Sequence, residues 1–215
     1  MRPMFRISKR QMLSLALVIC LAPVFANASG FEGRVSADVD TPIVGAMVTF
    51  RFGSPFQERT VFTAEDGHYQ VSGLPAATDY AIRVRRIGWH DIRTSGSTPD
   101  QGGQQLDFTM VQHTDMAKVA AQLPANHWYA LVLERLTDEN EREQLVRQCN
   151  MCHQQGNAAT RLQRPPEEWH KVLSLMARMG GGLEMEFRKK LPELFNSAYD
   201  PKTAVPRLTK DFGQP

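Results

Sequence analysis

Cysteine usage restricts this chain more than any other feature of its sequence. The chain holds three cysteines, and two of them stand in one motif, Cys149-Asn150-Met151-Cys152-His153. A Cys-x-x-Cys-His motif is the signature of covalent c-type haem attachment. The two thiols add across the haem vinyl groups, and a helical turn would then hold His153 beneath the iron as its proximal ligand. We therefore expect one covalent haem c, attached through Cys149 and Cys152.

Three other uses of the cysteine pair remain open at this level. A thioredoxin-like redox pair would follow a strand in a βαβ unit, whereas this pair follows a charged helical stretch. A zinc site would need two further ligands, and the sequence has no second Cys pair. A structural disulfide would close a very small loop and stabilise little. The motif favours haem over all three.

The N-terminal residues have the layout of a cleaved secretory signal. A basic start is followed by an apolar stretch over 12–22 and by Ala26-Asn27-Ala28, which suits a signal peptidase. We predict a signal peptide over residues 1–28. The alternative is a retained anchor, but a membrane span needs about 20 apolar residues. Cleavage would remove Cys20, leave no stable membrane span and deliver a periplasmic or secreted protein.

Composition supports a folded chain and gives no sign of a nucleic-acid partner. The chain has 215 residues, of which 42% are hydrophobic, so it can build packed cores. The formal net charge is only +2, whereas nucleic-acid-binding proteins usually carry a strongly basic patch. We expect no nucleic-acid binding.

Residues 30–112 read as an all-β domain. Short apolar stretches alternate with Gly-, Pro- and Asp-containing turns, which is typical of a sandwich or a barrel. Strands are expected at 33–37, 46–50, 60–63, 69–71, 80–85 and 106–110, with turns that include Gly96 to Pro99 and Gly102-Gly103.

The same region resembles the carboxypeptidase regulatory-like domain, a small Ig-like β-sandwich. The resemblance rests on five segments, which are Gly33-Arg34-Val35, residues 42–48, residues 63–69, Gly73-Leu74-Pro75, and Tyr80 with Ile82, Val84 and Gly88. It implies a structural or docking module without chemistry of its own.

The remaining chain changes to a helical pattern. Residues 113–123 are expected to form a linker, in which 116–122 is a short helical or linker stretch, and 124–215 an all-α domain. Thr137 is expected to cap a helix that leads to the cysteines. Another helix should start at Pro165-Pro166 and stop at the glycines from Gly180. A last helix is expected over 184–196, followed by an irregular tail that contains Pro201 and Pro206.

The second axial ligand has several candidates after the motif: Met176, Met179, Met185 and His170. Here the sequence is similar to a class of small cytochrome c domains, in which an arginine, a Trp that opens a helix, a Met two turns later and a glycine follow the motif. Arg161, Trp169, Met176 and Gly180 stand in that order. The resemblance implies a cytochrome c-like fold, with Met176 as the axial ligand and Arg161 and Trp169 beside the haem. Arg161 and Arg164 are candidates to pair with haem propionates or, equally, solvated arginines. The other histidines, His68, His90, His113 and His127, are expected at the surface or in turns.

These patterns together predict a two-domain exported cytochrome that transfers electrons to or from a redox partner protein. The β-sandwich would serve as an accessory or docking domain. Nothing in the sequence supplies an enzymatic site of its own. One alternative is an electron-accepting part of a larger enzyme, because proteins with a similar domain order continue into a virginiamycin B lyase-like propeller. A haem-based ligand sensor is the other alternative.

Overall fold

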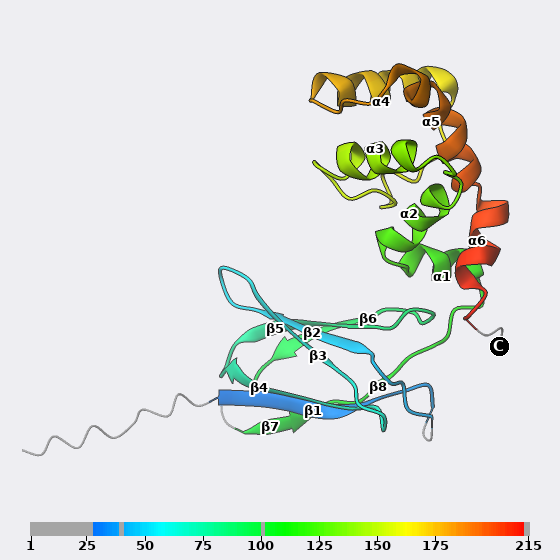
Figure 1. Ribbon diagram of the computed structural model, residues 1–215. Coiled ribbons are helices and arrows are strands. Elements are labelled where there is room, and N and C mark those ends of the chain that lie inside the picture. Colours follow the sequence, from blue (N-terminus) through cyan, green and yellow to red (C-terminus); the bar gives the residue numbers. More distant parts are fainter. Residues whose placement is uncertain (1–27, 39–40, 100–101, 213–215) are drawn as a thin grey trace, which may run out of the picture.

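The computed structural model describes residues 28–38, 41–99 and 102–212. A β-sandwich forms the first part of the chain and helices form the second, as Figure 1 shows. This confirms the expected order of a β unit and a helical unit. The predicted signal peptide, residues 1–28, lies outside the described residues except for Ala28, with which strand β1 begins.

The sandwich consists of two four-stranded sheets. In the first sheet, β1 (Ala28–Ser36) pairs antiparallel with β4 (His68–Pro75) and parallel with β7 (Gly103–Gln105) and β8 (Phe108–Thr109). The second sheet has the order β3-β2-β5-β6 and is antiparallel throughout. Its strands are β2 (Met47–Phe52), β3 (Gln57–Phe62), β5 (Asp79–Arg85) and β6 (Ile92–Ser97).

Alternating apolar side chains fill the space between the two sheets. Val48, Phe50 and Phe52 point inward from β2, whereas the residues between them do not. Phe50 stacks on Phe31 of the facing sheet, with ring centroids 5.1 Å apart. Each buried side chain of this size stabilises the fold by about 1.5–3 kcal/mol, so the period-two pattern is sufficient to define the sandwich.

Strands β6 and β7 form where the glycines predicted turns. Gly96 lies in β6 opposite Tyr80, and a Cβ atom at Gly96 would come within 2.7 Å of the Tyr80 hydroxyl. This glycine therefore makes room for a neighbouring ring and does not mark a turn.

Six helices follow the sandwich in the described part of the chain. They are α1 (Met116–Gln122), α2 (Ala125–Leu133), α3 (Glu139–Cys149), α4 (Pro166–Arg178), α5 (Met185–Ala198) and α6 (Pro201–Thr209). The segment 113–123, predicted as a linker, thus holds α1. Asp138 caps α3 where Thr137 was expected, because the Asp138 carboxylate accepts hydrogen bonds from the backbone N–H groups of Asn140 and Glu141 at 2.8 and 3.1 Å.

The expectation of an irregular tail after Pro201 is wrong. Pro201 occupies the first turn of α6, where its missing N–H is not needed, and Asp200 caps the helix by accepting from the Lys202 N–H at 3.0 Å. Pro206 lies inside this short helix, whose buried residues include Ala204. Packing of that face outweighs the helix-breaking tendency of the proline.

The helices pack around a second apolar core, which includes Trp128, Leu145, Trp169 and Phe195. Helix α1 joins this core through Ala120, whose carbonyl accepts a hydrogen bond from the Trp128 indole at 2.9 Å. None of the helices in the described residues is both long enough and apolar enough to cross a membrane.

The junction between the two units is built by the side chain of Gln122. Its amide accepts from the Gly88 N–H at 2.8 Å and donates to the Trp89 carbonyl at 2.7 Å. His113 lies nearby and is only 8% exposed, with its ring 3.8 Å from that of His90. The expectation that His113 lies at the surface or in a turn is therefore wrong, because this residue, just before α1, is covered at the junction.

Candidate functional site

The Cys-x-x-Cys-His motif lies at the C-terminal end of α3. The helix ends at Cys149, and the residues from Asn150 to His153 form a turn. Both cysteines are free; Cys149 is half-buried, whereas Cys152 is exposed. Burial raises the pKa of the Cys149 thiol to about 11, so this thiol stays protonated at neutral pH.

A buried glutamine lies directly behind the motif. Gln155 is 7% exposed, and its amide nitrogen donates to the Cys149 carbonyl at 2.7 Å and lies 3.2 Å from Nδ1 of His153. The following Gly156 has φ +80°, and a Cβ there would come within 2.1 Å of the Ala125 carbonyl oxygen. The close approach of this loop to α2 therefore requires glycine, and it fixes Gln155 under the histidine ring.

A cleft opens between the motif and helix α4. It holds about 1080 Å³ of space, which includes the solvent at its open mouth. Its apolar lining includes Trp169, Val172, Leu173, Met176 and Phe195. The cleft is therefore suited to a mostly apolar group.

Most residues predicted for the haem site meet in this cleft. Cys149, Cys152, His153, Trp169 and Met176 all line it. Trp169 is 3% exposed, and its indole donates to the Asn196 side chain at 2.9 Å. Met176 is half-buried.

The other axial candidates are less well placed. Met179 also lines the cleft but is 62% exposed. The lining, as far as the structure describes the chain, does not include Met185, which is 65% exposed, or His170, which is also exposed.

The two arginines that follow the motif have different surroundings. Arg164 lines the cleft, and its guanidinium lies over the Trp169 ring at 5.1 Å. Arg161 is not among the described residues that line the cleft. Its guanidinium stacks over Trp128 at 4.3 Å and reaches the Ala121 carbonyl at 3.4 Å. Arg161 thus connects the loop after the motif to α1 and α2.

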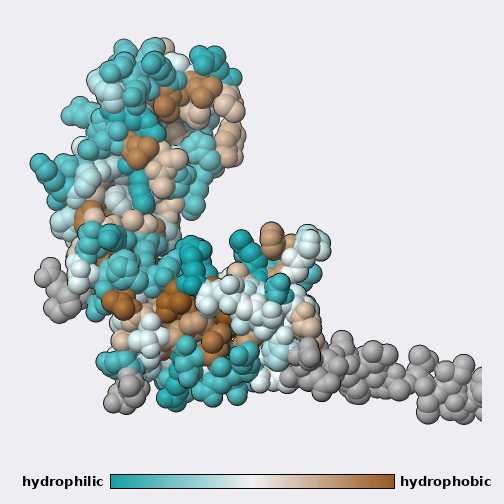
Figure 2. All heavy atoms as spheres, turned by 180° about the vertical axis from the view of Figure 1, so that it is seen from behind, coloured by the Kyte–Doolittle hydropathy of each residue, from teal (hydrophilic) through white to brown (hydrophobic). Residues whose placement is uncertain are grey.

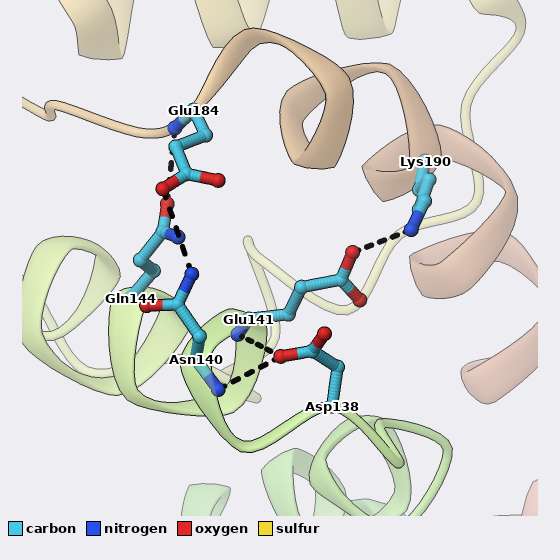
Figure 3. A network of polar contacts seen from close by, with 6 residues as sticks. All are labelled: Asp138, Asn140, Glu141, Gln144, Glu184 and Lys190. Carbon is cyan, nitrogen blue, oxygen red and sulfur yellow. Dashed lines mark hydrogen bonds and ion pairs between the residues drawn. The ribbon is translucent and has the colours of Figure 1, made fainter.

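A polar network joins α3 to α5 and to the loop that precedes it, as shown in Figure 3. Glu141 of α3 pairs with Lys190 of α5 at 2.5 Å. The Gln144 side chain accepts from the Glu184 backbone N–H at 3.0 Å, and Gln148 accepts from the Gly182 N–H at 3.2 Å. These contacts fix α3, and with it the motif, against the loop that leads from α4 into α5.

The charges in the cleft are of one sign. The described lining holds the guanidinium groups of Arg164 and Arg188 and no carboxylate. Within the described ranges, no three His, Cys, Asp or Glu side chains gather into a group that could hold a metal ion. The cleft thus offers two thiols, an imidazole, three thioethers and two cations, a donor set that fits an iron porphyrin with anionic propionates.

Sequence reasoning missed Gln155, Arg188 and Phe195 as members of this site. Gln155 is the second residue after the motif, but only its burial reveals its contacts. Arg188 and Phe195 lie on α5, whose residues 191, 195 and 198 form a buried stripe that indicates a core helix and gives no sign of a cleft.

Comparison with known proteins identifies the first unit. Residues 30–111 match the family model of the carboxypeptidase regulatory-like domain. The N-terminal sandwich is therefore a carboxypeptidase regulatory-like, Ig-like domain, as its sequence predicted. No curated protein matches the sequence.

Solved structures resemble the chain only remotely. Chlorocatechol 1,2-dioxygenase from Pseudomonas putida matches with 15% identity and a TM-score of 0.34, over 40% of this chain and 61% of that one. The dioxygenase domain of a dioxygenase carbohydrate-binding protein fusion from Streptomyces sp. SirexAA-E matches with 13% identity and a TM-score of 0.33, over 43% of this chain and 84% of that one. The chain thus spans about three fifths of the chlorocatechol dioxygenase, and likenesses this weak carry no functional argument.

Proposed function

We propose that this protein is an exported c-type cytochrome that carries one covalent haem c and transfers single electrons to and from a redox partner protein. The observation that carries the proposal is the meeting of Cys149, Cys152, His153 and Met176 around one apolar cleft. In this proposal, the helical unit is a cytochrome c-like domain and the sandwich is its accessory domain. The signal-like N-terminus supports a periplasmic or secreted location.

The residues of the cleft would divide the work of holding the cofactor. Cys149 and Cys152 would form the two thioether bonds, and His153 and Met176 would supply nitrogen and sulfur ligands from opposite walls. When bound, the haem iron supplies a one-electron couple between its ferric and ferrous states. Trp169, Leu173 and Phe195 would exclude water.

The arginines of the cleft would orient the cofactor. Arg164 and Arg188 both line the cleft, and a guanidinium fork pairs well with a carboxylate such as a propionate. Arg188 also donates to the hydroxyl of Ser174, a residue of α4, at 3.2 Å. This bond holds the Arg188 side chain against α4. These cations in an apolar cleft would favour a single orientation of the ring.

Covalent attachment can be tested directly. The full chain should be exported from bacteria that express the c-type maturation machinery, and haem should stay with the polypeptide after acid–acetone extraction. Cys149→Ala with Cys152→Ala should remove it, whereas Met151→Ala, which alters an exposed position inside the same turn, should retain it. Stoichiometric haem on the double variant after extraction, or none on the wild-type chain, would refute the proposal.

A further inference from the structure

An arginine cluster lies on the outer face of the second sheet, beside the helical unit. Arg83 of β5 lies directly opposite Arg93 of β6, and Arg85 follows two residues on along the same face. Arg86 comes next in the chain and is exposed. These four residues, Arg83, Arg85, Arg86 and Arg93, form what we call the arginine corner. Like charges directly opposite one another destabilise a sheet, so the arrangement is unfavourable in isolation.

A single carboxylate, that of Asp91, pairs with arginines of this cluster. Asp91 accepts from Nε and Nη2 of Arg83 at 2.8 and 2.5 Å, and the Arg93 guanidinium lies 3.9 Å from the same oxygen. Arg86 reaches only the Gly45 carbonyl, at 3.5 Å. In the described part of the chain, the Arg85 side chain makes no hydrogen bond or ion pair. Four guanidinium groups against one carboxylate leave three uncompensated positive charges.

The arginine corner borders a cleft between the sheet and the helical unit. The cleft holds about 1110 Å³ out to its mouth and is lined by Arg83, Arg85 and Arg86 on the sheet side. Ala121, Gln122 and Pro124 line the helical side, so the described lining brings no second acid to balance the cluster. Figure 1 shows the helices standing over one end of this sheet, and Figure 2 shows the recess between the two units from behind.

We infer that the arginine corner is a docking site for an acidic segment of a partner protein. Asp or Glu carboxylates entering the recess would pair with the forked guanidiniums of Arg85 and Arg86, which suit two-point contacts. Met47 and Ile87 in the same cleft would add apolar contact, as the centre of a protein–protein interface usually does.

The shape and the overall charge favour a protein over other anionic partners. A planar bilayer cannot reach the floor of a recess that has walls on two sides. The whole chain carries a formal net charge of only +2, so it lacks the long-range field that gathers nucleic acids or other polyanions. The site belongs to the sheet and the junction, and it does not depend on the presence of haem.

The experiment measures binding of a fluorescent six-glutamate peptide to the full chain by anisotropy, at low salt to limit screening. Arg85→Glu should weaken binding at least about tenfold, and Arg93→Glu, at a residue whose side chain is 67% exposed, at least about threefold. Arg51→Glu is the matched control, because Arg51 lies on the same sheet face at the far end of β2 and already pairs with Glu58. It should change the affinity less than about twofold. Circular dichroism would establish that each variant is folded.

Three results would overturn the inference. The first is that the peptide fails to bind up to millimolar concentration. The second is that Arg51→Glu weakens binding as much as Arg85→Glu does. The third is that phosphatidylserine vesicles or heparin bind more tightly than the peptide and lose that binding on Arg85→Glu, which would make the site one for lipid or polyanions.

Discussion

Gln155 is buried beside the motif, and its amide nitrogen lies 3.2 Å from Nδ1 of His153. Histidines that bind a metal usually donate their other ring N–H to an acceptor, which raises the basicity of the ligand. The Gln155 amide nitrogen stands 3.2 Å from Nδ1 and also donates to the Cys149 carbonyl, so it offers the ring a donor, whereas a carboxylate at this position would offer an acceptor. Gln155 is therefore a positioning residue for His153.

Replacing Gln155 should change the redox potential of the loaded protein. Gln155→Glu should lower the midpoint by tens of millivolts, where 59 mV corresponds to a tenfold change in a one-electron equilibrium. Gln155→Leu, which removes the amide but adds no charge, should shift the midpoint less than Gln155→Glu does. Spectroelectrochemical titration would measure both values. Gln154→Glu adds the same charge at an exposed neighbour and should have the smaller effect; equal shifts at both positions would contradict the assigned role.

Met176 and Met179 are distinguished by their exposure. Both line the cleft, but Met179 is 62% exposed at its mouth, whereas Met176 is half-buried. Met176→Ala should abolish the weak long-wavelength Met–iron absorption band, lower the midpoint potential and allow external ligands to bind. Met179→Ala should leave the spectrum intact and cost under about 1 kcal/mol, as surface substitutions usually do. Loss of the band in the Met179 variant would show that Met179, and not Met176, is the axial ligand.

At the level of helices and strands, the elements with local signals were predicted and those fixed by tertiary packing were not. Alternation along β2 and the Pro-Pro-Glu-Glu start of α4 mark those elements in the sequence itself. Strand β6 and helix α6 lie instead on segments with glycine or proline, whose usual preferences favour turns. Packing of Gly96 against Tyr80 and of Ala204 in the helical core overrides them.

The residues of the candidate site also divide into those with a local sequence signal and those placed by tertiary packing. Its motif is contiguous, so Cys149, Cys152 and His153 can be recognised without any knowledge of the fold. Met176 and Trp169 can be predicted from the helical spacing and from the resemblance to cytochrome c domains. Arg188 and Phe195 lie on α5, about 35 and 42 residues beyond the motif. They reach the cleft because α3 docks on α5 through polar contacts such as Glu141–Lys190. No sequence pattern encodes that docking.

At the level of the whole molecule, α1 ties the two units together but belongs to the helical one. Val119 and Ala120 are fully buried, and Ala120 receives the hydrogen bond of the Trp128 indole. Helix α1 also packs along α6. The sandwich contributes Ile87, which packs against the helical core, and the backbone groups of Gly88 and Trp89 that Gln122 binds. By these contacts, the boundary between the two units lies before α1.

Two fragments that differ only in α1 test this boundary. A fragment of residues 114–215, exported with the maturation machinery, should fold and keep its haem. A fragment of residues 123–215 lacks the burial of Val119, at about 1.5–3 kcal/mol, and the Trp128 hydrogen bond, at about 1 kcal/mol. It should unfold at a clearly lower temperature or lose its haem. Both fragments lack the Ile87 and Gly88 contacts equally, so the difference between them measures α1 alone. Equal melting temperatures by circular dichroism would show that α1 is a linker, as the sequence predicts, and that the sandwich is needed to hold it in place.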